Sequence, residues 1–207
     1  MWQMRGVSAL GFRVHSGWAA VVVVALERGA PVVVDRRRME LIEAKMRGAQ
    51  QPYHAAKEMK LADAEAFLKG CGEATLTVAT ASLRGVLSEA ASKGYEAAGA
   101  CILLGSGRPT GDLAATLRSH AMIHTAEGQF FRNVVQQACE TCGLPLTGVK
   151  EKELMKRATD GISVRPGEIE RRIAETGKRI GPPWRQDEKL CTIGGWLVLA
   201  SSGAQLS

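Results

Sequence analysis

The segment G17-W-A-A-V-V-V-V-A-L26 is a ten-residue apolar run that carries four consecutive valines. β-Branched side chains favour a buried strand over a helix, and the run is too short to cross a bilayer as a helix. The turn E27-R-G-A30 joins it to P31-V-V-V-D35, so these two segments are expected to pair as a hairpin. A further strand is predicted before the run, at residues 7–14. The chain therefore begins with three meandering strands.

Residues 36–98 are harder to assign. The part from 36 to 53 mixes charged and apolar residues and fits either a strand edge or a short helix. From about residue 54 to 94, apolar side chains recur at three- and four-residue spacing, which predicts a long helical segment. Gly70, Gly72 and Gly85 interrupt this pattern and indicate either close packing or a break into two helices.

The second half alternates strand and helix. A strand is predicted at 99–105, and Asp112 is expected to cap one helix that runs to about Cys142 and stops at Gly143. A strand at 144–149 and helices at 151–158, 165–177 and 188–200 complete the order. We predict a single α/β domain over 1–207, with three antiparallel N-terminal strands followed by parallel strands and flanked by helices.

The composition bounds the function only loosely. The 207 residues carry a formal net charge of +6, with clusters at R36-R-R38 and R171-R172. This balance fits nucleic acid or another polyanion as partner, and it equally fits a solvated surface. Five cysteines and no recognisable signal peptide favour a reducing cytoplasm, no membrane partner is expected, and a homodimer is compatible with the sequence.

Three segments resemble a known family. A138-C-E-T-C-G-L-P-L-T-G-V-K-E-K-E-L154 resembles a helix end, a strand and a helix start of the Holliday-junction resolvase branch of the ribonuclease H-like superfamily. The stretch 162–200 resembles its last part, and G11-F-R-V-H-S-G-W-A19 resembles its first strand. The resemblance implies a ribonuclease H-like mixed sheet and, in active members, two-metal cleavage of phosphodiesters by clustered carboxylates.

The carboxylates that this chemistry requires are largely missing. The position of the first-strand aspartate falls on Arg13, and the acidic position after the fourth strand falls near Gly105 or Ser106. Asp187 and Glu188 at the last helix are the remaining catalytic candidates. No Asp or Glu lies between residues 1 and 26, so a small alignment error does not restore the site. No cofactor is expected, and Mg²⁺ or Mn²⁺ would be needed only if a nuclease activity survives.

A polar helix face is the other candidate site. His120, His124 and Glu127 have i, i+4, i+7 spacing and project from one side of a predicted helix. Capping and packing is the commonest role for such residues, but a polar ligand or partner site and a metal site remain alternatives. We assign His120, His124, Glu127 and Arg132, together with Arg13 and Ser106, as ligand-binding candidates, and assign no metal ligand.

The sequence favours a catalytically inactive ribonuclease H-like protein with a binding or scaffolding role. Two alternatives stay open. One is a divergent metal-dependent nuclease or hydrolase that uses a relocated His/Glu site. The other is a basic nucleic-acid-binding module without catalysis. Whether any enzymatic activity survives is left open by the sequence.

Overall fold

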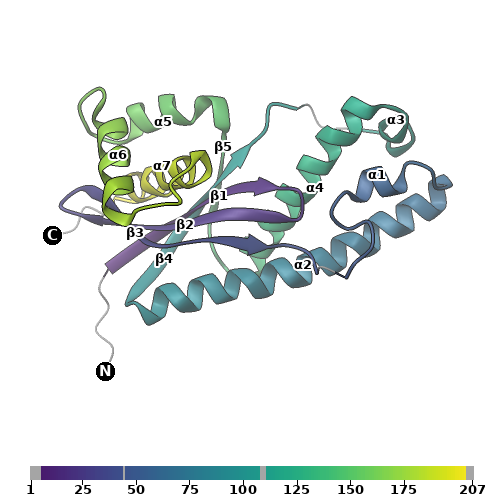
Figure 1. The fold of residues 1–207 in the computed structure, drawn as a ribbon, viewed down its shortest axis with the longest axis horizontal. Helices are drawn as coiled ribbons and strands as arrows, with labels where there is room; N and C mark the ends of the chain where they lie inside the picture. Colours follow the sequence, from purple (N-terminus) through teal and green to yellow (C-terminus); the bar gives the residue numbers. More distant parts are fainter. Residues whose placement is uncertain (1–5, 44, 108–110, 204–207) are drawn as a thin grey trace.

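The computed structural model describes residues 6–43, 45–107 and 111–203. Its centre is a five-stranded sheet with strand order β3-β2-β1-β4-β5 (Figure 1). The strands are β1 (Gly6–His15), β2 (Trp18–Glu27), β3 (Ala30–Glu40), β4 (Tyr95–Leu104) and β5 (Leu146–Lys150). The first three strands are antiparallel, and β4 and β5 run parallel to β1. The predicted mixed sheet is confirmed.

The hairpin between β2 and β3 forms where the sequence predicts it. Glu27 pairs with Ala30 across a two-residue turn in which both central residues have positive φ, 51° at Arg28 and 73° at Gly29. Such turns match the twist of the strands that they join. β3 then continues through the arginine cluster to Glu40, so the ambiguous segment 36–40 is a strand edge.

Helices cover both faces of the sheet, which explains the unbroken valine run. Val21 and Val23 belong to a core with α2 (Leu61–Ser92) and α4 (His120–Thr141), whereas Val22 and Val24 face α7 (Gln186–Ser201). A strand that is buried on both faces can be apolar at every position. The second face is completed by η1 (Glu151–Glu153), α5 (Leu154–Gly161) and α6 (Glu168–Ile180).

The last helix lies against the first strand without side chains between them. A Cβ atom built on Gly11 would lie 1.9 Å from the carbonyl oxygen of Cys191. Only glycine permits such a backbone approach. This contact fixes the beginning of α7 beside the end of β1, and it therefore brings Asp187 close to Arg13.

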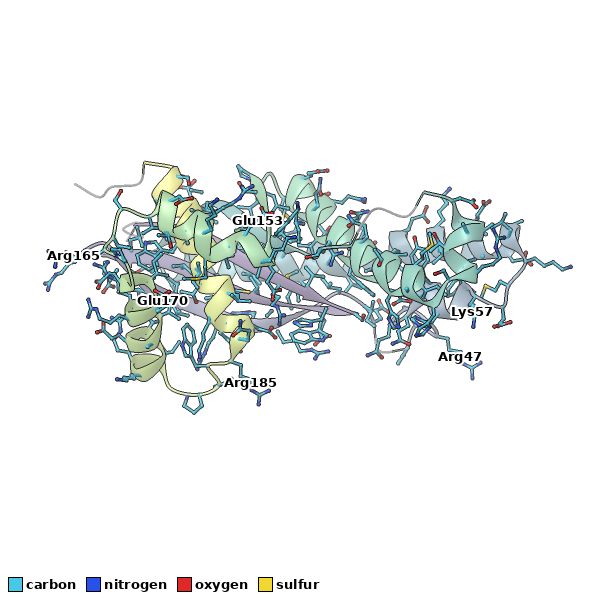
Figure 2. The ribbon with its side chains drawn as sticks, turned by 90° about the horizontal axis from the view of Figure 1, so that it is seen from above. Arg47, Lys57, Glu153, Arg165, Glu170 and Arg185 are labelled. Carbon is cyan, nitrogen blue, oxygen red and sulfur yellow. The ribbon has the colours of Figure 1, made fainter. Side chains whose placement is uncertain are left out.

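The molecule extends beyond the sheet at one end. Here α1 (Pro52–Ala56), α3 (Leu113–Arg118) and the adjoining ends of α2 and α4 form a helical extension (Figure 1). It has a small apolar cluster of its own, with Ala56, Ala64 and Leu117 at its centre. Figure 2 shows Arg47 and Lys57 at this end of the elongated molecule and Arg165 at the opposite end.

Two helix predictions were wrong in detail. The helix expected from Asp112 to Cys142 is divided at Ser119, which is extended (φ −120°, ψ 113°) and caps α4 through a hydrogen bond from the Met122 backbone N–H. Asp112 caps only the short α3.

The helical segment from residue 54 to 94 also consists of two helices, but the break lies at residues 57–60 and not at a glycine. Gly70 and Gly85 lie inside α2 with open space where a side chain would be, so close packing does not explain them. Within the described part of the chain, no helix is long and apolar enough to span a membrane.

Candidate functional site

One edge of the sheet brings together several of the candidate site residues predicted from the sequence. Because β1, β4 and β5 are parallel, their carboxyl ends meet at the same edge, which is where ligands bind in many α/β proteins. Arg13 lies near the end of β1, Gly105 follows β4, Glu151 follows β5, and Asp187 lies in the first turn of α7. We call this group of residues the carboxyl edge.

The Arg13 side chain joins the two carboxylates of the carboxyl edge. Its Nε lies 3.0 Å from Glu151 Oε2, and a second guanidinium nitrogen donates to Glu151 Oε1 at 3.1 Å, so the pair is bidentate. The remaining nitrogen donates to Asp187 Oδ1. Bidentate guanidinium–carboxylate pairs are among the stronger polar contacts in proteins. Arg13 therefore contacts both carboxylates from a position between them and balances part of their combined negative charge.

A stack of rings continues from this ion-pair network toward the sheet edge. His15 Nε2 lies 3.2 Å from Asp187 Oδ2, without hydrogen-bond geometry. The His15 ring stacks on Trp18, with 4.2 Å between the ring centroids, and the Arg38 guanidinium lies 4.4 Å from the Trp18 ring on β2. Both neighbours pack on the Trp18 ring, which limits its use as a stacking platform for a base.

The protonation of the network follows from these contacts. The hydrogen bonds to Glu151 are the main reason that the pKa of Arg13 is raised; partial burial opposes this effect, and the bond to Asp187 adds to it. Arg13 thus carries a fixed positive charge. A metal ion that entered between Glu151 and Asp187 would have to displace this charge.

Structural comparison identifies the architecture. The chain superposes on a structure of Thermus thermophilus RuvC with a TM-score of 0.55 over 96% of this chain and 98% of that one, at 11% identity. T. thermophilus RuvC in complex with a Holliday junction substrate gives the same TM-score over 95% and 94% of the two chains, at 9% identity. The fold is ribonuclease H-like. The sequence matches no protein-family model and no curated protein. The resemblance to the resolvase branch is thereby confirmed at the level of the fold.

The carboxyl edge does not fit the two divalent ions used by ribonuclease H-like nucleases. Hard cations need several free oxygen ligands, and here both Glu151 and Asp187 are engaged by Arg13. Glu188, the other catalytic candidate, accepts a hydrogen bond of 2.7 Å from the Arg185 backbone N–H and closes the first turn of α7. The residues present accordingly support an ion-pair network at this position.

A second arginine reaches the carboxyl edge from the opposite face of the sheet. A Cβ on Gly105 would lie 3.4 Å from an Arg132 guanidinium nitrogen, and Ser106 is exposed beside it. Desolvation by burial lowers the pKa of Arg132, and its Nε has no hydrogen-bond partner among the described residues. Arg132 is therefore a partly buried cation beside this edge whose Nε has an unused hydrogen-bond donor.

The two arginine clusters singled out in the sequence are largely engaged within the protein. Arg36 donates to backbone carbonyls of residues 180–183, and Arg37 pairs with Asp35 at 2.6 Å. Arg171 and Arg172 both pair with Glu168 at 2.6 Å. These clusters fix β3 and α6 in place, so they contribute less to a phosphate-binding surface than their sequence suggests.

The predicted polar helix face lies in the helical extension, away from the carboxyl edge. His120 and His124 contact one another, whereas Glu127 is buried and contacts His54 of α1, a residue that the sequence analysis did not select. The sequence analysis also missed Glu151. No spacing signal links either residue to its partner, because 73 and 138 residues separate them along the chain.

Proposed function

We propose that this chain is a ribonuclease H-like protein that binds branched or double-stranded nucleic acid and does not cut it. The observation that carries the proposal is the bidentate and bridging position of Arg13 between Glu151 and Asp187. A guanidinium there brings one positive charge to the two carboxylates in place of divalent metal ions, and it supplies neither a Lewis acid nor a metal-bound hydroxide. The cleavage chemistry of the fold is consequently absent.

A binding role is supported by three features. The net charge of +6 favours association with a polyanion. The partly exposed Arg132 guanidinium lies beside Gly105 and adds positive charge at the carboxyl edge, where we expect a phosphate to bind. A protein of the same fold, T. thermophilus RuvC, has been captured with a Holliday junction substrate. Nucleic acid with a junction is therefore the ligand class to test first.

The test is a pair of assays with one labelled four-way junction. In a cleavage assay with Mg²⁺ or Mn²⁺ we expect the junction to stay intact. In an anisotropy titration we expect binding at low salt that weakens as salt rises, because phosphate contacts release counterions. Arg132→Ala should weaken binding, while Arg84→Ala, an exposed residue on α2, serves as the matched charge control.

Two results would overturn the proposal. Metal-dependent cleavage by the wild-type chain that disappears in Asp187→Asn would restore the nuclease interpretation. Failure to bind the junction or a plain duplex at low salt would remove nucleic acid as the ligand.

A further inference from the structure

Three of the four histidines of this chain converge in the helical extension. His54 comes from α1, and His120 and His124 come from the first turns of α4. One ring nitrogen of each lies within 4.8 Å of those of the other two. The fourth histidine, His15, lies at the carboxyl edge. Segments far apart in the chain thus meet as one imidazole cluster.

The two helical histidines face each other nitrogen to nitrogen. His120 Nε2 and His124 Nε2 are 3.0 Å apart, and their ring planes are nearly perpendicular, at 83°. Two imidazole nitrogens in this position share either one proton or one cation. Nitrogens bound to the same zinc at about 2.0–2.1 Å with tetrahedral angles are about 3.3 Å apart. The observed separation is close to that value.

Glu127 orients the His54 side chain through hydrogen bonds. It is buried, and its Oε1 accepts hydrogen bonds from the His54 backbone N–H at 3.0 Å and from the His54 ring at Nδ1 at 3.1 Å. A carboxylate that accepts a hydrogen bond from Nδ1–H fixes the tautomer in which Nε2 has a free lone pair. Metal-binding histidines commonly have such a carboxylate behind them.

The helix break at Ser119 places His120 and His124 at the start of α4, where they can face His54. Because Ser119 is extended and starts α4 anew, His120 occupies the first position of α4 and His124 follows one turn later on the same side. His120 and His124 are exposed and His54 is half-buried, so solvent reaches the cluster. The apolar core of this extension is small, with three buried residues among those that the structure describes. A cross-link between α1 and α4 would therefore matter for its order.

We propose that His54, His120 and His124 bind one Zn²⁺ ion, with Glu127 as the carboxylate that orients His54 and with a fourth position open to water. The ligand chemistry selects the metal, because imidazole suits zinc and related d-block ions, whereas Mg²⁺ and Ca²⁺ prefer oxygen. Three nitrogens and an open position are a known zinc arrangement. The three ring nitrogens lie within 4.8 Å of one another, so binding requires the His54 ring to move by up to about 1.5 Å toward the other two to reach the spacing of a tetrahedral zinc site.

The direct test is zinc titration of the full chain, expressed without a histidine tag and stripped of metal. Calorimetry with Zn²⁺ alone should give one site per chain. His54→Ala, His120→Ala and His124→Ala should each weaken binding by at least about 10-fold, since each removes one of three ligands. The matched control His15→Ala removes the fourth histidine and should leave the zinc affinity unchanged.

Two further measurements distinguish a three-histidine site from non-specific zinc binding by the His120–His124 pair alone. Co²⁺ in place of Zn²⁺ should give the visible absorption of a tetrahedral site in the wild type and lose it in His54→Ala. Zinc at about 100 times its Kd should raise the Tm by about 5–10 °C. No stoichiometric zinc binding, or binding that is the same in His54→Ala as in the wild type, would overturn the three-histidine site.

Discussion

The carboxyl edge and the histidine cluster both bring together polar side chains that are far apart in the sequence, but they differ in where the positive charge comes from. At the edge, two carboxylates from segments far apart in sequence receive a cation that belongs to the chain, the Arg13 guanidinium. In the extension, three imidazoles converge with no cation from the described residues between them, and the carboxylate of Glu127 lies behind His54. The carboxylates of the carboxyl edge already have a cation from the chain. The imidazoles of the histidine cluster do not, so a bound metal ion would supply it. The position of the balancing charge, more than the number of polar residues, decides which site can take a metal.

The largest expected effect comes from reversing the charge at the edge. Arg13→Asp would place three carboxylates together and leave Glu151 and Asp187 without their partner. Because these groups are only partly buried, we expect a loss of about 2–3 kcal/mol in the free energy of unfolding. Mn²⁺ should recover part of this loss, because the new cluster offers several oxygen ligands.

Thermal melts with and without Mn²⁺ check this prediction, and Arg84→Asp, at an exposed position on α2, is the control for charge alone. Arg13→Asp should respond to Mn²⁺ and the control should not. Equal responses in wild type and Arg13→Asp would mean that Arg13 does not decide metal binding at the edge.

A carboxamide in place of the buried Glu127 should have the next largest effect. Glu127→Gln keeps the shape but weakens the acceptor for the His54 ring. We expect zinc affinity to fall about 10–100-fold, as when other carboxylates behind metal ligands are replaced. Gln129→Glu, on an exposed face of the same helix, is the control. An unchanged affinity in Glu127→Gln would show that His54 does not need its carboxylate.

These two regions differ in how far the sequence reveals them. Arg13 could be identified because no acid lies near it in the first strand, and His120 and His124 could be identified from helical spacing alone. Glu151 and His54 could not, because their roles depend on contacts across 138 and 73 residues. The break at Ser119 was missed in the sequence analysis although serine favours helix caps, because the apolar pattern continues on both sides of it. Local patterns thus predicted strands, helices and half of each site, while tertiary pairing supplied the rest.

Two buried cysteines, one in the core on each face of the sheet, should make the stability sensitive to alkaline pH. Burial raises the pKa of the Cys101 and Cys139 thiols from an ordinary 9.0 to about 12. The folded state therefore holds protons that the unfolded chain releases above pH 9, so stability should fall as the pH rises from 9 toward 12. Urea unfolding at pH 8 and pH 10 measures the change. Cys101→Ser and Cys139→Ser should each reduce the slope, and a slope that neither variant alters would assign the effect to other groups.

The smallest expected effect concerns an ion pair on the outer strand. Arg37 pairs with Asp35 at 2.6 Å, but the arginine side chain is 38% exposed. Exposed pairs of this kind contribute about 0–1 kcal/mol, so Arg37→Ala should lower the urea midpoint slightly, keep the zinc response and create no Mn²⁺ response. A loss as large as that in Arg13→Asp would mean that partial burial does not distinguish the edge network from a surface pair.

The most direct measurement is anomalous diffraction from crystals of the wild-type chain grown with both Mn²⁺ and Zn²⁺, with data collected at each metal's absorption edge. The account predicts a zinc peak among His54, His120 and His124, and Arg13 still bridging Glu151 and Asp187 without a metal peak. A manganese peak between Glu151 and Asp187, with Arg13 displaced, would contradict it.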